Sequence, residues 1–230
     1  MKIIVLTGAG MSAESGIPTF RGAGGLWEGY RIEDVASPEG WQKDQHLVLQ
    51  FYNERRKRIK EAQPNTAHFL LAEMEKYHDV QIITQNIDDL HERAGSKNII
   101  HLHGEIFKSR STKNEQLIYD CYDDIQQGDT ATDGCQLRPH IVWFGEMVPM
   151  MEVATQMMYD AEIVMVIGTS MVVYPAASLL YYAPSFATKY IINPEIPDMQ
   201  KTKNVIFIQK NATEGVKEVA EKLNVFDAGK

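Results

Sequence analysis

The stretch at residues 2–21 constrains the fold of this chain more than any other. It begins with an unbroken apolar run, residues 3–6, which is typical of a strand covered on both faces in a parallel sheet. A Gly-Ala-Gly turn follows at residues 8–10, and Ser12 offers a cap for a helix. A glycine turn between a strand and a helix start points backbone N–H groups at one spot and suits a phosphate. We therefore expect a nucleotide-binding turn.

The turn matches the pattern of dinucleotide-binding folds only in part. Gly8, Gly10 and Ala13 have the spacing G-x-G-x-x-A, and Glu28 follows about 20 residues on. An ordinary dehydrogenase needs a full-length helix after these glycines. Here the Gly-Ile-Pro sequence at residues 16–18 ends the helix within about two turns. The sequence therefore favours a nucleotide but not ordinary hydride transfer.

Apolar runs alternate with helical patterns along most of the chain. Strands are expected at residues 80–84, 99–102, 163–167, 190–192 and 205–208, and helices at 44–63, 67–74, 151–159, from Pro175, and at 216–223. This alternation predicts an α/β fold with a doubly wound, Rossmann-like parallel sheet. We expect one domain, residues 1–230, with a large lobe of about 1–21, 64–106 and 141–230 and a small inserted lobe of about 22–63 and 107–140.

Four polar loops each follow an expected strand, at residues 8–21, 85–88, 168–170 and 193–195. In a doubly wound sheet these strand ends converge on one crevice, so one nucleotide could contact all four loops. Asn86 and Asp88 could hold a ribose or a carboxamide, or could cap the next helix. His103 is a candidate general base, although a single histidine after a strand is more often structural.

The helix at residues 44–63 carries a possible anion receptor. Tyr52 and Arg55 lie three positions apart and therefore share one helix face. A phenol hydroxyl beside a guanidinium suits a carboxylate. The alternative for the basic run at residues 55–60 is a solvated helix face. The glycine-rich residues 22–27 could close over a ligand with Trp27 as an anchor, or could form a plain surface loop.

Taken together, these motifs resemble those of the sirtuins, the NAD-dependent protein lysine deacylases. The string G-A-G-x-S-x-x-S-G-I-P-x-F-R-G at residues 8–22 is far more specific than its glycines. The family's later motifs follow in order at residues 84–88, 103–104, 142–146, 168–170 and 192–193. The resemblance covers nearly the whole chain, the inserted lobe excepted. Because of it, we expect His103 to be catalytic rather than structural.

The resemblance implies a reaction that consumes NAD. The acyl oxygen of a modified lysine attacks the nicotinamide ribose, nicotinamide leaves, and the acyl group ends on ADP-ribose. His103 would be the general base, and Asn86 and Asp88 would position the nicotinamide and its ribose. The expected NAD-binding residues are Gly8, Ala9, Gly10, Ala13, Thr19, Phe20, Arg21, Trp27, Gln85, Asn86, Ile87, Asp88, Gly168, Thr169, Ser170, Asn193, Glu195 and Ala212. The expected substrate residues are Tyr52, Arg55, Val142, Phe144, Gly145 and Glu146, the last four as an extended edge for the peptide.

Tyr52 and Arg55 coincide with the Y-x-x-R pair of sirtuins that act on succinyl- and malonyl-lysine. Ala23 is small where many relatives carry a bulkier residue, and would leave room for such a chain. The resemblance thus implies a preference for acidic acyl groups, with Arg55 pairing the distal carboxylate and with some activity on acetyl groups. Transfer of ADP-ribose to a protein, or NAD sensing without turnover, are the alternatives.

The sequence departs from the family at the zinc site. Most sirtuins bind structural zinc through two C-x-x-C pairs in the small lobe. Here Ser111 and Asn114 stand where the first pair is expected, and Cys121 and Cys135 are the only cysteines of the sequence. We predict a small lobe without metal, held by packing. Two thiolates assisted by His or Asp are the alternative.

Composition limits the partners. The net charge of −8 argues against nucleic acid and anionic membranes, and no run is apolar enough to span a bilayer. Two cysteines do not make a disulfide framework. A strand is expected directly after Met1 and Lys2, and this leaves no room for a signal peptide. We expect a cytoplasmic protein whose partners are NAD and acyl-lysine peptides or proteins.

Overall fold

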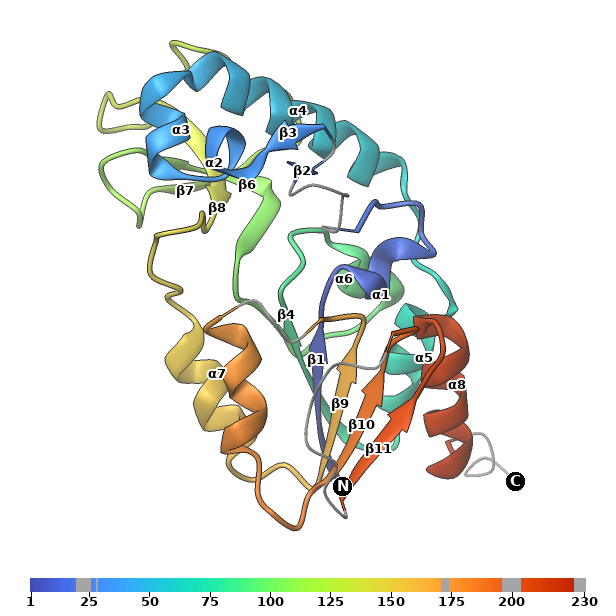
Figure 1. The fold of residues 1–230 in the computed structure, drawn as a ribbon. Coiled ribbons are helices and arrows are strands. Elements are labelled where there is room, and N and C mark those ends of the chain that lie inside the picture. Colours follow the sequence, from blue (N-terminus) through green and yellow to red (C-terminus); the bar gives the residue numbers. More distant parts are fainter. Residues whose placement is uncertain (20–25, 28, 171–173, 196–203, 226–230) are drawn as a thin grey trace.

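The structure is a computed structural model that describes residues 1–19, 26–27, 29–170, 174–195 and 204–225. Within these residues, six parallel strands form one sheet in the order β11-β10-β9-β1-β4-β5 (Figure 1). The strands are β1 (Lys2–Thr7), β4 (Asp79–Thr84), β5 (Ile99–His101), β9 (Ile163–Ile167), β10 (Thr188–Ile192) and β11 (Val205–Ile208). Each strand predicted from an apolar run is present, so the Rossmann-like parallel sheet is confirmed.

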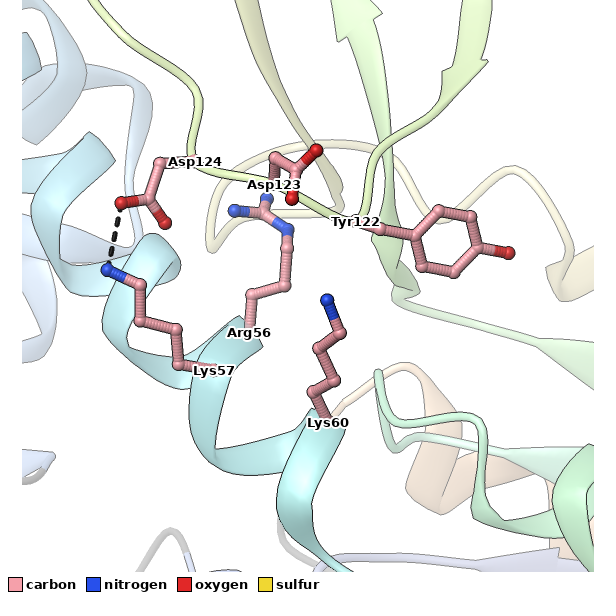
Figure 2. Close-up of a pocket in the computed structure, with 6 residues that line it drawn as sticks. All are labelled: Arg56, Lys57, Lys60, Tyr122, Asp123 and Asp124. Atoms are coloured by element: carbon pink, nitrogen blue, oxygen red, sulfur yellow. Dashed lines mark hydrogen bonds and ion pairs between the residues drawn. The ribbon is translucent and has the colours of Figure 1, made fainter.

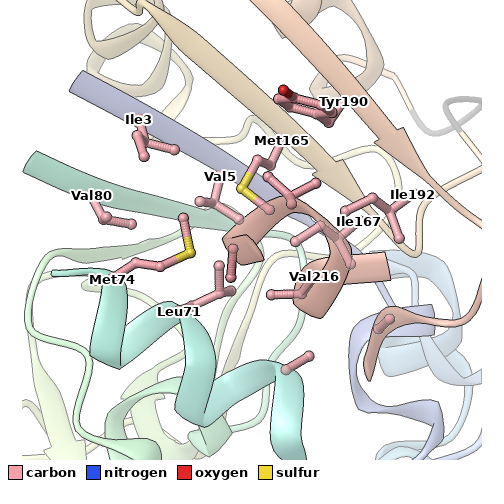
Figure 3. Packing of buried hydrophobic residues seen from close by; sticks show 14 of the residues in the cluster. Ile3, Val5, Leu71, Met74, Val80, Met165, Ile167, Tyr190, Ile192 and Val216 are labelled. Atoms are coloured by element: carbon pink, nitrogen blue, oxygen red, sulfur yellow. The ribbon is translucent and has the colours of Figure 1, made fainter. Parts of the chain in front are cut away.

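Helices cover both faces of this sheet. They are α5 (Thr66–Met74) and α8 (Ala212–Lys222) on one face, and α7 (Met151–Met158) and the 3-10 helix η1 (Ala176–Tyr182) on the other. Ile3 and Val5 of β1 pack toward α5 and α8 (Figure 3), whereas Ile4 and Leu6 pack toward α7 and η1. Successive strand side chains point to opposite faces, which is why a doubly covered strand must be apolar throughout.

The order of the strands places the ligand crevice. β1 lies between β4 and β9, so the chain leaves β1 toward one edge of the sheet and later returns to fill the other side. Open α/β sheets bind ligands at such a switch point, outside the carboxyl ends of the strands. The ends of β1 and β9 meet here, close to the short helices α1 (Gly10–Ala13) and α6 (Leu90–Ala94).

A second sheet lies in the small lobe, beyond the carboxyl ends of the parallel strands (Figure 1). It is antiparallel, in the order β7-β6-β8, with β6 (Gly104–Ser111), β7 (Ile118–Asp120) and β8 (Leu137–Ile141). The prediction that residues 107–140 lie outside the parallel sheet is therefore confirmed. Among the described residues, no helix has both the length and the hydropathy needed to cross a membrane.

Helices from the first quarter of the chain complete this lobe. They are α2 (Ile32–Val35), α3 (Pro38–Lys43) and α4 (Gln45–Glu61), beside the strand pair β2 (Leu26–Trp27) and β3 (Tyr30–Arg31). Helix α4 confirms the helix predicted at residues 44–63. The elements before it were not predicted, because each is only one or two turns or a residue pair long and shows no periodicity.

Candidate functional site

The glycine turn packs backbone against backbone. The N–H of Gly8 donates to the carbonyl of Ile167 (3.0 Å), and the N–H of Gly10 donates to the carbonyl of Gly168 (2.8 Å). A Cβ on Gly10 would lie 2.6 Å from the Cα of Gly168, and that glycine has a φ of +63°. Glycine is required at these positions because the turns after β1 and β9 touch. The two N–H groups are occupied within the protein, so their role differs from the phosphate donation expected from the sequence.

Ser12 does not cap a helix, contrary to the expectation. The residue before α1 is Ala9, which makes no side-chain cap, and Ser12 lies within the helix. Its hydroxyl donates instead to the carboxylate of Asp88 (2.9 Å) and accepts from the amide of Asn86 (3.1 Å). The amide of Asn86 also donates to the carbonyl of Gly8 (3.1 Å). The loops after β1 and β4 are thus joined by a buried hydroxyl, amide and carboxylate.

Asp88 is almost fully buried in this cluster. Burial raises the pKa of its carboxyl, while the Ser12 hydroxyl and the backbone N–H of Leu90 oppose that rise. The Leu90 N–H bond (3.2 Å) lies at the start of α6. Asp88 therefore assists the start of the helix with one carboxylate oxygen and accepts from Ser12 with the other, and its role toward a ribose or a carboxamide stays a prediction.

His103 follows β5 with its ring half buried. Its Nδ1 lies 3.0 Å from the carbonyl oxygen of Gln85. A carbonyl can only accept, so Nδ1 carries the proton and Nε2 has the free lone pair of the neutral ring. Burial lowers the pKa of His103, although the Gln85 carbonyl opposes that shift. A neutral imidazole with a fixed ring and an available Nε2 is suited to act as a general base.

A second histidine, His101, was missed by the sequence interpretation. Its Nδ1 lies 3.1 Å from the carbonyl oxygen of Asn86, and its Nε2 lies 2.8 Å from the carboxylate of Glu92. The signal was present as H-x-H at a strand end, since strand residues two apart point to the same side.

The other predicted NAD-binding residues lie at several strand ends. Gln85 donates its amide to Thr169 (3.3 Å), which joins the loops after β4 and β9. Asn193 follows β10 and donates to the carbonyl of Glu195 (2.7 Å). Ala212 begins α8 and is buried. The residues that the structure brings to the switch point are Gly8, Ala9, Gly10, Gln85, Asn86, Ile87, Asp88, His103, Gly168, Thr169 and Ser170.

Several predicted residues lie elsewhere or are not described. Thr19 is exposed, as is Ala13 on α1. Phe20, Arg21 and Ala23 lie outside the described residues. Trp27 packs edge to face on Phe51 (5.0 Å between ring centroids) in the small lobe. The sequence interpretation grouped this tryptophan with the NAD loops, whereas its ring packs on Phe51 and Arg55 of α4.

Tyr52 and Arg55 are buried on α4. Arg55 is 6% exposed, and its guanidinium carbon lies 4.1 Å from the ring centroid of Trp27. The Tyr52 hydroxyl accepts a hydrogen bond from the indole N–H of Trp143 (3.1 Å). Burial raises the pKa of Tyr52 well above its usual value, so the phenol stays neutral, and Arg55 is close enough to oppose that shift. The solvated-face interpretation is wrong for Arg55.

The segment at residues 142–146 connects His103 to this pair. The N–H of Val142 donates to the carbonyl of His103 (2.9 Å), and Trp143 meets Tyr52. Phe144 and Gly145 form a turn rather than the expected extended edge, with Gly145 at a φ of +88°.

The Glu146 carboxylate points into the protein. It accepts from Nη1 of Arg138 (2.6 Å) and from the backbone N–H of Trp143 (2.8 Å). Burial raises the pKa of Glu146, but the Arg138 guanidinium outweighs this and holds the pKa below its usual range. Glu146 therefore fixes the turn through its carboxylate.

The residues at the family's zinc position do not fit a thiolate metal site. The Ser111 hydroxyl donates to Asp133 (2.7 Å) and accepts from the N–H groups of Lys113 (3.1 Å) and Asn114 (3.2 Å). Its hydrogen-bonding capacity is used within the turn. Across the residues that the structure describes, no group of three or more His, Cys, Asp or Glu could hold a metal ion. A small lobe without zinc remains a prediction.

An open hollow of about 440 Å³ lies on the outer side of the small lobe. Figure 2 shows it between α4 and the loop at residues 122–124, lined by Arg56, Lys57, Lys60, Tyr122, Asp123 and Asp124. Arg56 donates to the carbonyl of Ile106 (3.0 Å) and to the side chain of Asn53 (2.7 Å), and Lys57 pairs with Asp124 (2.8 Å). The Lys57–Asp124 pair ties the loop to the helix, and Arg56 ties the helix to β6. None of the lining residues belongs to the cluster around His103.

Comparison with known proteins places these features in one family. A model described as the Sir2 family matches residues 8–175. A Bacteroides thetaiotaomicron protein named NAD-dependent protein deacylase is 52% identical over 228 residues, covering 96% of this chain and 97% of that protein. A Helicobacter pylori protein of the same name is 51% identical over 222 residues, covering 96% and 95%.

Solved structures of the same family have a similar fold. A Sir2 homolog in complex with NAD has a TM-score of 0.87 at 39% identity, covering 99% of this chain and 90% of that chain. A mutant Sir2 homologue in complex with ADP-ribose has a TM-score of 0.89 at 38% identity, covering 100% and 94%.

Proposed function

This chain belongs to the Sir2 family and is an NAD-dependent protein deacylase, and on that premise we propose which acyl groups it removes and which residues do so. The preferred substrates are lysines that carry succinyl or malonyl groups, with acetyl-lysine as a further substrate. The observation that supports this choice is the buried Tyr52 and Arg55 pair on α4. A guanidinium in such surroundings attracts a carboxylate more strongly than an exposed one, because water and salt screen it less.

The residues at the switch point fit NAD. The close approach of the loops after β1 and β9 leaves no room for a Cβ at Gly8 or Gly10. Beside them, Ser12, Asn86 and Asp88 present a hydroxyl, an amide and a carboxylate in a buried cluster. These are suitable partners for a carboxamide and for ribose hydroxyls. We assign nicotinamide and its ribose to this cluster, and the remainder of NAD to the loops at residues 168–170 and 193–195.

His103 serves as the general base. NAD, when bound, supplies the ribose that accepts the acyl group and releases nicotinamide. The Gln85 carbonyl holds the His103 ring through Nδ1–H, so Nε2 can take the proton of a ribose hydroxyl. The lowered pKa of His103 keeps the ring neutral near pH 7, which a base requires.

The peptide part of the substrate approaches along residues 142–146. Val142 is bonded to His103, and Trp143 is bonded to Tyr52, so this segment runs from the base to the acyl-recognition pair. The ring of Phe144 is partly exposed, which makes it available to a substrate. We also propose that the protein acts in the cytoplasm, which the bacterial origin of its relatives supports.

A single assay tests the acyl preference. The protein is incubated with NAD and with succinyl-, malonyl- or acetyl-lysine peptides of one sequence, and peptide mass and nicotinamide are followed together. Arg55→Met is expected to abolish desuccinylation and demalonylation while largely sparing deacetylation. An equal loss of all three activities would contradict the role of Arg55. Lys57→Met is the matched control, because Lys57 is exposed and pairs with Asp124.

The same assay separates the other two functions. Nicotinamide release together with an increase in the mass of a protein would indicate transfer of ADP-ribose. NAD binding without turnover of any peptide would indicate a sensor.

A further inference from the structure

Two histidines hold the loop that carries Asn86 and Asp88. His103 binds the carbonyl of Gln85 through Nδ1 (3.0 Å), and His101 binds the carbonyl of Asn86 through Nδ1 (3.1 Å). Between them, the N–H of Leu102 donates to the carbonyl of Thr84 (2.9 Å). The last residue of β5 and the two residues after it therefore bind three consecutive carbonyls, at the last residue of β4 and the first two residues of the loop after it.

The surroundings of His101 fix its charge. Its side chain is 9% exposed, and its second nitrogen, Nε2, lies 2.8 Å from the Glu92 carboxylate. Both ring nitrogens thus face oxygens that can only accept, the Asn86 carbonyl and the Glu92 carboxylate. Both must carry a proton for both bonds to form, which makes the ring an imidazolium cation. His103 has one such bond and stays neutral.

We propose that His101, held as a cation by Glu92, is a positioning residue for NAD-dependent deacylation: it fixes the backbone at Asn86 and places a positive charge beside the buried carboxylate of Asp88. This inference rests on the proposed roles of Asn86 and Asp88 in holding the nicotinamide ribose. His101 need not touch NAD. It acts through the loop, because the carbonyl it binds belongs to one of the two residues assigned to the ribose.

The charges around His101 agree with this role. Burial lowers the pKa of His101, but the hydrogen bond and charge of Glu92, together with Glu105, outweigh it and raise the pKa. The pKa of Glu92 is lowered by the same bond in spite of its burial. The pKa of Asp88 is raised by burial, and His101 is among the groups that oppose this. The charged or titratable groups that face the pair are His68, Asp88, Asp89, His91, Glu105 and Lys108.

Glu92→Gln separates the charge from the hydrogen bond. A glutamine can still bond to Nε2, and a neutral His101 can still donate from Nδ1 to Asn86, but the cation is lost. We expect the KM for NAD to rise about tenfold while the folded fraction stays unchanged. In the wild type, the KM for NAD should rise as the pH increases and His101 loses its proton. In Glu92→Gln this rise should occur at a lower pH, because the ring loses its proton more easily without the carboxylate. A merely structural role for Glu92 would not shift that profile.

His101 variants test the hydrogen bond. His101→Leu removes both bonds and should lower kcat/KM for NAD by about a hundredfold, as a displaced catalytic geometry does. His101→Asn keeps a donor near the position of Nδ1 and should recover most of that loss, though not the wild-type pH profile. Glu73→Gln is the matched control, since Glu73 forms an ion pair with Lys76 on the surface of α5 and should change neither quantity.

Two further variants, Asn86→Ala and Asp88→Asn, distinguish the proposed ribose-binding role of this loop from the proposed positioning role of His101. If they leave NAD turnover unchanged, the assignment of the ribose to this loop is wrong. If they impair it while Glu92→Gln and His101→Asn leave the KM for NAD and its pH profile at wild-type values, only the inference on His101 is overturned. Glu92→Gln keeps the size and shape of the side chain, so the test does not depend on the folding of His101→Leu.

Discussion

The two sheets of this protein are stabilised in different ways. The parallel sheet is held by apolar side chains on both faces, as the fully buried residues of β1 show. The small lobe has an apolar cluster around Val48, Phe51 and Trp143, and adds to it buried polar groups that join its elements. Arg56 of α4 binds the carbonyl of Ile106, Asn53 binds residue Ile125, and Arg138 binds Glu146. The cofactor is therefore expected to bind to a rigid apolar framework, and the acyl group to a polar lobe that can vary without loss of the chemistry.

The largest effect on activity should come from a substitution at the carboxyl end of the parallel sheet. His103→Ala removes the base and should lower every deacylation by about 10²–10⁴-fold while leaving the melting temperature unchanged. Succinyl and acetyl peptides should lose activity in the same proportion, in contrast to Arg55→Met. Turnover rates on both peptides, together with a thermal melt, check this. Retention of turnover by the alanine variant would remove His103 from the mechanism.

A substitution in the small lobe should instead destabilise the protein. Arg56 is 1% exposed and donates to Ile106 and to Asn53. Arg56→Met leaves the buried Ile106 carbonyl without its donor. It also removes one of two donors to Asn53, which keeps the N–H of Ile125, so the substitution should cost about 3 kcal/mol of unfolding free energy. Urea unfolding measures the change. The exposed neighbour Lys60 is the control, and Lys60→Met should change stability by less than about 0.5 kcal/mol. Similar changes in unfolding free energy for both substitutions would show that the buried hydrogen bonds of Arg56 do not stabilise the small lobe.

The same contrast explains what could be predicted from the sequence. An apolar run such as residues 3–6 specifies a doubly covered strand by itself, and the glycines at residues 8–10 mark a close approach of two loops. His103 stood out only through the motifs around it. The contact of Arg56 with Ile106 joins residues far apart in sequence, and the contacts of Glu146 with Arg138 and Trp143 close an irregular turn after β8 that has no periodic pattern. The contact of His101 with Glu92 joins the end of β5 to α6, and its geometry depends on how the helix packs beside the strand, which no sequence pattern specifies.

Acid should destabilise the large lobe more than the small lobe, because burial lowers the pKa of both His68 and His91 in the large lobe, whereas in the small lobe it lowers the pKa of the half-buried His140. Burial lowers the pKa of His68 from 6.5 to about 4. Its Nδ1 accepts from the N–H of Asn65 at the start of α5, so protonation there would break that bond. A depressed pKa in the folded state means stabilisation that is present above pH 6.5 and is lost as the pH falls toward 4, about 3 kcal/mol in all. Glu146 of the small lobe has a lowered pKa too, but from a usual value of 4.5, so its contribution is lost only at lower pH.

Stability measured between pH 7 and pH 4 checks this order. His68→Leu should reduce the loss above pH 4.5, because no histidine then has to gain a proton at that buried position, and the remaining loss is expected from His91 and His140. Arg138→Met should leave that part of the curve unchanged and alter the part at lower pH. If the two variants gave the same pH dependence, the assignment of acid sensitivity to the framework would be wrong.

The smallest effect concerns the turn where other sirtuins bind zinc. Ser111 uses its hydroxyl on Asp133 and on two backbone N–H groups, so we expect the lobe to need no metal. Ser111→Ala should cost about 1 kcal/mol, the usual contribution of such a hydrogen bond. A chelator should leave the melting temperature and the activity of the wild type unchanged, and metal analysis should find no stoichiometric zinc. Zinc at one equivalent per chain, removed by the chelator with a loss of stability, would show instead that Cys121 and Cys135 recruit further ligands and that this lobe is held by a metal ion after all.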